Sequence, residues 1–251
     1  MIDVHCHLEQ PEFDRNLKTF VEEWKKELKF VVSSCSHPQD LKKSFEIYQQ
    51  FKPFVKICVG IHPEYAHQVK EEEIEKVINF IEKNERDISA IGEIGLDYYC
   101  MTEELVRKKQ ENLFLTFIEL AKKLEKPVVV HARNSFLEVI EILEKKNMQG
   151  RKVLMHLMTE KKYVERIVKN SWFLSLGPGI LKSKNQKKVA RDVPLQNLML
   201  ETDSPWFAQP DQKFGVPLNV KIVCKKIAEI KKLNEEEIEK ITDINACKFF
   251  L

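Results

Sequence analysis

Two histidines near the start of the chain, His5 and His7, have the spacing of a metal-binding pair. Side chains alternate between the two faces of a strand, so residues two apart share a face. An H-x-H pair in a strand therefore presents two imidazoles side by side to one cation, while Cys6 between them points to the opposite face. Taken alone, such a pair is more often two unrelated histidines than a metal site.

Four later residues that can also bind a metal ion change this interpretation. They are the carboxylates and imidazoles of Glu93, His131, His156 and Asp203. Each lies at the carboxyl end of an apolar, strand-like segment, and barrel enzymes carry their catalytic residues at this end of their strands. Six such coincidences are hard to explain by packing. The sequence therefore predicts a metal site whose ligands are His5, His7, Glu93, His131, His156 and Asp203.

The segments that must position these residues alternate between two patterns. Short apolar segments rich in β-branched residues predict strands over residues 2–7, 30–34, 55–61, 88–94, 128–132, 153–157, 172–176 and 198–203. Amphipathic stretches between them predict helices over residues 14–28, 41–51, 71–84, 103–125 and 136–146. Such alternation indicates parallel βαβ units in an α/β protein. Eight strands favour a single-domain (β/α)₈ TIM barrel over residues 1–251 rather than an open doubly wound sheet.

The predicted ligands suit two divalent ions. Nitrogen and carboxylate ligands without thiolates are typical of Zn²⁺, Mn²⁺ or, in an oxygen-rich shell, Mg²⁺. A carboxylate can bridge two ions, and Glu93 is placed to do so. One ion would take His5, His7, Glu93 and Asp203, and the other would take Glu93, His131 and His156. Paired ions activate a water and polarise a phosphoryl or carbonyl oxygen, so Glu93 and Asp203 are the predicted catalytic residues, with Asp203 as the proton acceptor.

Two further residues near the same strand ends are candidates for substrate binding. His62 follows the third predicted strand, and Arg133 lies two positions beyond His131, on the same face. A guanidinium can hold a phosphate through paired hydrogen bonds. The alternative role for Arg133 is a surface salt bridge.

Other polar residues are expected to have secondary roles. Glu201 shares the face of Asp203 and is expected to orient a metal ligand. Asp97 and Tyr98 are expected to line the cleft. His37 fits no ligand position and is expected at the surface.

Composition excludes several classes of protein. The 41 Lys and Arg nearly balance the 39 Asp and Glu, so nucleic-acid binding would need a local basic patch. The six cysteines, Cys100 among them, include no C-x-x-C pair, which argues against a zinc ribbon and indicates reduced thiols. Neither a signal peptide nor an apolar run of about 18 residues is present. A cytoplasmic protein without a membrane partner is expected, and nothing contradicts a monomer.

Five segments resemble the TatD family of metal-dependent deoxyribonucleases. They are VHCH at residues 4–7, GIHP at 60–63, GEIGLDYY at 92–99, PVVVHAR at 127–133 and LETDSP at 200–205. The resemblance implies an amidohydrolase-type barrel, the six ligands named above, and magnesium-stimulated cleavage of DNA. It further implies 3′–5′ exonuclease action on single-stranded DNA or 3′ ends. His62 and Arg133 match residues near the substrate phosphate.

The chain departs from the family in the loop after His156. The family commonly has an aromatic residue and then a glycine there, whereas residues 157–160 are LMTE. An alternative function is therefore an amide or ester hydrolase of the same superfamily, such as a deacylase of aminoacyl-tRNA. Many two-metal amidohydrolases bridge their ions with a carbamylated lysine where this chain has Glu93, which favours the nuclease. A catalytically silent binding module is the third alternative, and the intact ligand set argues against it.

Overall fold

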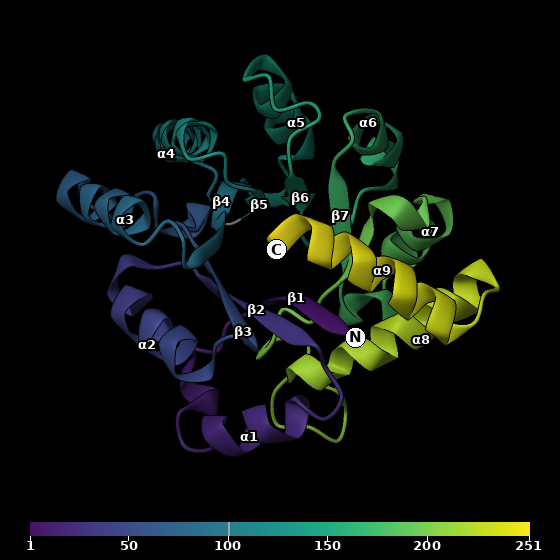
Figure 1. Cartoon of the computed structure of the whole chain (residues 1–251). Helices are drawn as coiled ribbons and strands as arrows, with labels where there is room; N and C mark the ends of the chain where they lie inside the picture. The colour runs from purple at the N-terminus through teal and green to yellow at the C-terminus, as the bar shows by residue number, and fades with distance from the viewer. Residues whose placement is uncertain (100) are drawn as a thin grey trace.

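The computed structural model describes residues 1–99 and 101–251, so Cys100 lies outside the described residues. Eight parallel strands pair in chain order around a barrel, and the helices lie outside them, as predicted (Figure 1). The strands are β1 (Ile2–Cys6), β2 (Phe30–Cys35), β3 (Val55–Val59), β4 (Ile88–Asp97), β5 (Val128–Arg133), β6 (Val153–Met155), β7 (Phe173–Leu176) and β8 (Leu198–Leu200).

The helices follow the strands along the chain, and all but the last lie around the outside of the barrel (Figure 1). They are α1 (Leu17–Trp24), α2 (Leu41–Phe51), α3 (Glu71–Lys83), α4 (Glu104–Lys123), α5 (Phe136–Lys145), α6 (Val164–Lys169), α7 (Lys184–Asp192), α8 (Val220–Lys231) and α9 (Glu235–Phe250). The prediction over residues 14–28 was too long, because residues 14–16 and 25–27 form turns on either side of α1. Among the described helices, none combines the length and apolar character needed to cross a membrane.

The barrel closes between β8 and β1 through the segment that follows β8. The backbone N–H of Asp203 donates to the carbonyl of His5 at 2.9 Å. The buried carboxylate of Asp3 accepts from the Thr202 backbone N–H at 2.9 Å and from its hydroxyl at 2.6 Å. The prediction that strand 8 reaches residue 203 was wrong, because Asp203 has a left-handed φ of 54° that a strand does not allow.

The glycines beside Glu93 let β4 and β5 approach closely. Gly95 has φ 142°, and a Cβ on it would lie 2.0 Å from the carbonyl oxygen of His131. Glycine is therefore required at this position, where β4 pairs with β5. This contact places Glu93 and His131 on adjacent strands of the site.

The amino end of the barrel is closed by α9. We call the apolar group there the amino-end cluster, formed by Ile2, Val4, Phe30, Val32, Cys58, Ala90, Val129, Leu154, Met199, Ala246, Phe249 and Phe250. Figure 1 shows α9 crossing the barrel, with the C-terminus near its centre. The N-terminal amine of Met1 pairs with Glu239 at 2.7 Å and Asp243 at 3.4 Å, which places α9 beside the start of β1.

Candidate metal centre

All six predicted ligands meet at the carboxyl end of the barrel. His5 lies in β1, Glu93 in β4 and His131 in β5. The other three, His7, His156 and Asp203, lie just beyond the ends of β1, β6 and β8. The prediction that Glu93 ends its strand was wrong, because β4 continues to Asp97.

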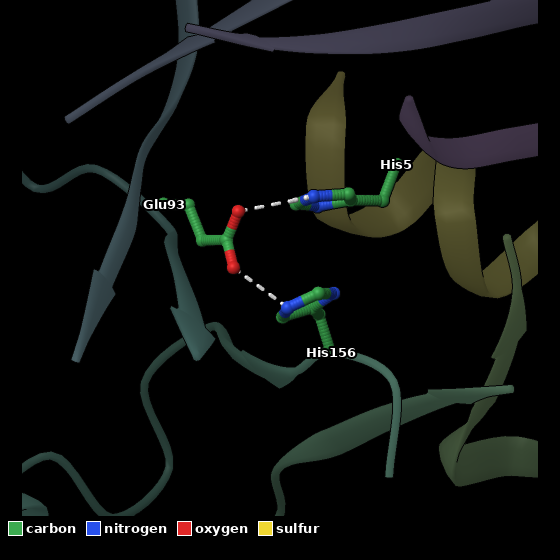
Figure 2. Close-up of side chains that lie close together, drawn as sticks. All are labelled: His5, Glu93 and His156. Carbon is green, nitrogen blue, oxygen red and sulfur yellow. Dashed lines mark ion pairs between the residues drawn. The ribbon is translucent and has the colours of Figure 1, made fainter. Parts of the chain in front are cut away.

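The carboxylate of Glu93 lies between two groups of histidines. Its Oε1 lies 2.7 Å from His156 Nε2 and 2.8 Å from His131 Nδ1. Its Oε2 lies 3.3 Å from His5 Nε2 and 3.8 Å from His7 Nε2 (Figure 2 shows the pairs with His5 and His156). Each oxygen thus faces a different set of imidazoles, which is the arrangement that a bridging carboxylate needs.

Three overlapping groups of side chains have ligand atoms within 4.8 Å of one another. The groups are His5, Glu93 and His156; His5, His7 and Asp203; and His62, Glu93 and His131. The first two groups consist entirely of predicted ligands. His62 Nε2 lies 3.1 Å from His131 Nδ1 and 3.5 Å from Glu93 Oε1. His62, which was expected to contact substrate, is therefore also within reach of an ion at this centre.

In two of these histidines, a carboxylate lies near the ring nitrogen that faces away from Glu93. His131 Nε2 lies 3.1 Å from Asp97 Oδ2, and His156 Nδ1 lies 3.6 Å from Glu201 Oε2. Glu201 is fully buried and accepts from the Ser175 hydroxyl at 2.7 Å. Such outer partners set the tautomer and orientation of a ligating histidine. Asp97 is close enough to orient His131, whereas Glu201 lies beyond hydrogen-bond distance of His156, so the orienting role expected of Glu201 stays a prediction.

Two further residues that contact the histidine ligands were not predicted from the sequence. Ser34 Oγ lies 3.3 Å from His5 Nδ1, and the buried Glu9 places Oε1 3.4 Å from His7 Nδ1. The continued spacing of two residues from His5 through His7 to Glu9 is a signal that could have found Glu9. No local pattern indicates Ser34, which reaches His5 from the neighbouring strand.

The centre mixes carboxylates and imidazoles whose pKa values shift strongly. Burial opposes the charged form of Glu93, but the surrounding histidines, above all His156, outweigh it and hold its pKa well below the usual range. Burial likewise opposes protonation of His7, yet hydrogen bonds with Asp203 and Glu9 raise its pKa to about 10. A cation entering the centre must displace such protons, so metal binding would release them.

The pKa of His62 shifts in the opposite direction from that of His7. Burial, with the neighbouring imidazole of His131, lowers the pKa of His62 to about 3. Its imidazole is therefore uncharged near neutral pH. A neutral imidazole can both donate and accept a hydrogen bond, and its ring nitrogen Nδ1 already accepts from the Glu64 backbone N–H at 3.1 Å.

A cleft of about 750 Å³ opens over these residues. Asp97 lines it, as expected. The expectation for Tyr98 was wrong, because this side chain is buried and its hydroxyl donates to Glu111 at 2.8 Å. His37, which fits no ligand position, belongs to none of the ligand groups among the described residues, and it lines the cleft with its ring 4.4 Å from that of Tyr65.

Arg133 lies at the end of β5 and also lines the cleft. Its guanidinium lies 3.9 Å above the ring of Tyr99, a cation–π arrangement. The side chain is thus held at the edge of the cleft, where a bound anion would meet it.

Comparison with known proteins identifies the family to which the chain belongs. The family model described as TatD-related DNase matches residues 2–251. Human deoxyribonuclease TATDN3 is 31% identical over 261 residues, which cover 100% of this chain and 94% of the relative. A metal-dependent hydrolase of Methanocaldococcus jannaschii, described as uncharacterised, is 33% identical over 256 residues, with 99% and 96% covered.

Solved structures agree on the fold. The TatD homologue YJJV of Escherichia coli matches with a TM-score of 0.91 at 20% identity, covering 100% of this chain and 97% of that one. A TatD-family hydrolase of Entamoeba histolytica also gives 0.91, at 19% identity with 100% and 98% covered. With its barrel, its gathered histidines and carboxylates, and a family match over nearly every residue, the chain belongs to the TatD-related DNase family of metal-dependent hydrolases.

Proposed function

We propose that this protein is a deoxyribonuclease that hydrolyses DNA phosphodiester bonds at a dinuclear metal site, removing nucleotides from the 3′ end. The observation that carries the proposal is the position of Glu93, whose two carboxylate oxygens face different sets of imidazoles. Family membership and the name of the human relative support DNA as the substrate. Residues 1–251 would act as one hydrolase domain, and a cytoplasmic, monomeric state remains a prediction.

The donor atoms fit two divalent ions. One ion would be held by His5, His7, Glu93 and Asp203, and the other by Glu93, His131 and His156. All of these side chains offer nitrogen or carboxylate oxygen, the ligands that suit Zn²⁺, Mn²⁺ and Mg²⁺. When bound, such ions lower the pKa of a water and polarise a phosphoryl oxygen.

The chain's own residues supply proton transfer and phosphate binding. Asp203 borders the cleft, and its Oδ1 lies 3.4 Å from His7 Nε2 and 3.7 Å from His5 Nε2. We assign to this carboxylate the removal of a proton from the attacking water. The uncharged imidazole of His62 and the guanidinium of Arg133 are assigned to the phosphate oxygens, with Arg133 able to form two parallel hydrogen bonds.

One observation favours a second function, hydrolysis of an amide or ester such as the bond of an aminoacyl-tRNA. Leu157 and Thr159 line the cleft in the loop where the family commonly has an aromatic residue and a glycine. The cleft wall beside His156 therefore differs from the wall common in the family. This different wall could select an acyl group in place of a phosphodiester.

The deciding experiment follows an end-labelled single-stranded DNA oligonucleotide incubated with the purified protein. Reactions with Mg²⁺, with Mn²⁺ and with EDTA are run beside an Asp203→Asn control. The expected result is metal-dependent shortening that the control lacks, and the product ladder reports the direction of attack. Intact DNA with every metal, despite measured metal in the protein, would reject the nuclease and favour the amide or ester hydrolase.

A further inference from the structure

Two large aromatic side chains are exposed at the mouth of the cleft. Trp206 is 49% exposed and Phe207 is 41% exposed, and both line the cleft. The other two tryptophans of the chain, Trp24 and Trp172, are almost fully buried. Exposed aromatic surface at a binding cleft is typical of a surface that a ligand covers.

Of the two aromatic residues, Trp206 lies directly beside the candidate metal centre. The ring of Trp206 meets that of His7 edge to face, with the ring centroids 4.7 Å apart. Trp206 also follows Asp203 by three residues, and its backbone N–H donates to the Asp203 carbonyl at 3.1 Å. A molecule whose reacting group lies at the centre would therefore extend over the indole.

The backbone around Trp206 is tightly closed. The N–H of Gly215 donates to the carbonyl of Pro205 at 2.7 Å, which brings the two ends of the intervening loop together. A Cβ on Gly215 would lie 2.1 Å from the Trp206 carbonyl oxygen, so only glycine allows this approach. The loop that carries both aromatic rings is thus held at its base.

The same loop is also anchored by the residues around Gly215. The ring of Phe214 packs against Phe13 and Phe20, at centroid distances of 5.4 and 6.2 Å. The side chains of Gln212 and Asn219 form a pair of reciprocal hydrogen bonds at 2.7 and 3.0 Å. A surface held in this way needs little ordering when a ligand binds, which favours affinity.

The charges of the cleft limit how a nucleic acid could be held. Among the described residues that line it, Arg133 is the one Lys or Arg, whereas Glu9, Asp40 and Glu64 add carboxylates to those of the centre. Arg133 ends β5 and Trp206 lies beside β1, and these strands are opposite each other in a ring of eight. The cleft therefore offers a cation on one side and aromatic rings on the other, rather than a basic groove that follows a long backbone.

We infer that Trp206 and Phe207 form a stacking platform for an unpaired nucleobase at the end of a DNA strand. The inference rests on the proposed nuclease function and specifies how that function selects its substrate. Every nucleobase has a flat aromatic face, so the platform accepts any base but requires one that is not paired in a duplex. The stacked base would hold the adjoining phosphodiester over the metal centre.

The test compares two short single-stranded oligonucleotides that differ only at their terminal residues. One carries thymidine at both ends, and the other carries a tetrahydrofuran abasic analogue at both ends. We expect the wild-type protein to show a kcat/KM about ten- to a hundredfold higher for thymidine, because base–aromatic stacking has about this effect. Trp206→Ala is expected to bring the ratio close to one, Phe207→Ala to lower it, and Trp206→Phe to keep most of it.

The control is Leu105→Ala, a change at a 77% exposed apolar residue of α4 that does not line the cleft. This variant is expected to keep the wild-type ratio. Circular dichroism and metal content are measured for each variant, since Trp206 contacts His7. If Trp206→Ala loses metal, Phe207→Ala decides, because it leaves the Trp206–His7 contact in place.

The outcomes separate the platform from the nuclease. A wild-type protein that cleaves both oligonucleotides at equal rates would overturn the platform and leave the nuclease standing. A ratio that survives in both alanine variants would do the same. Failure of the wild-type protein to cleave either oligonucleotide with Mg²⁺ or Mn²⁺ would overturn the proposed function and the platform with it.

Discussion

The two ends of this barrel are made by the same strands from opposite kinds of side chain. At the carboxyl end, imidazoles and carboxylates converge, with polar atoms of Glu93 2.7 to 3.8 Å from those of five histidines. At the amino end, apolar strand residues meet Phe249 and Phe250 of α9 (Figure 1). Within β4, Ala90 belongs to the amino-end cluster and Glu93 to the site.

This contrast indicates that stability and activity are separable along the barrel axis. Burying apolar surface favours folding, whereas gathering ionisable groups out of water opposes it. The amino-end cluster can therefore stabilise the fold while the carboxyl end carries the chemistry. The following changes test this separation, beginning with the largest expected effect.

Glu93→Ala is expected to lower metal-dependent turnover by more than about a thousandfold, because it removes the carboxylate shared by both proposed ions. The circular dichroism spectrum should remain that of a folded barrel, since little apolar packing is lost. Glu111→Ala is the control, because this carboxylate contacts Tyr98 rather than a candidate ligand. Retained turnover in a folded Glu93→Ala variant would reject the two-metal assignment.

Phe249→Ala should have the converse effect at the other end. Phe249 is 1% exposed and packs against Phe173 and Phe250, so its removal is expected to lower the free energy of unfolding by about 3–5 kcal/mol. Urea denaturation measures this change, and metal-dependent turnover per folded molecule should persist. The control is Leu251→Ala, at a residue that is 70% exposed at the same end. A loss of turnover comparable to that of Glu93→Ala would show that the two ends are coupled.

Asp97→Asn should weaken metal binding about ten- to a hundredfold, because it changes the outer partner of His131. Competition with a chromogenic chelator measures the affinity for Zn²⁺ or Mn²⁺. Glu111→Gln, a matched loss of charge on a carboxylate that bonds Tyr98, should leave the affinity unchanged. Equal affinities in the wild-type protein and both variants would show that Asp97 does not support metal binding.

Arg133→Ala is expected to raise KM for DNA about tenfold while metal content stays constant, because the guanidinium is assigned to phosphate rather than to an ion. Arg107→Ala is the matched control. Its guanidinium also lies over a tyrosine ring, 4.4 Å from Tyr98, but it does not line the cleft. Loss of bound metal in the Arg133 variant would mean that its role is to support the centre.

Local sequence patterns were sufficient to predict the barrel and to bring the candidate ligands to one end. The β-branched segments of β1, β4 and β5 specify strands on their own, and a parallel barrel places all their carboxyl ends together. The types of these side chains then predict binding of divalent ions, because imidazoles and carboxylates are the ligands that such ions prefer. The helices α6 and α7 were not predicted, since α6 has only six residues and α7 is mostly polar.

The sequence alone thus determined the fold class and the types of group at the site, but the tertiary structure decided how these groups face one another. The partners of His5 and His131, Ser34 and Asp97, come from neighbouring strands, so their contacts depend on the register between strands. The left-handed turn at Asp203 and the exposure of Trp206 depend on packing between distant segments. Local propensity carries no information about such contacts, because long-range packing selects the conformations that make them.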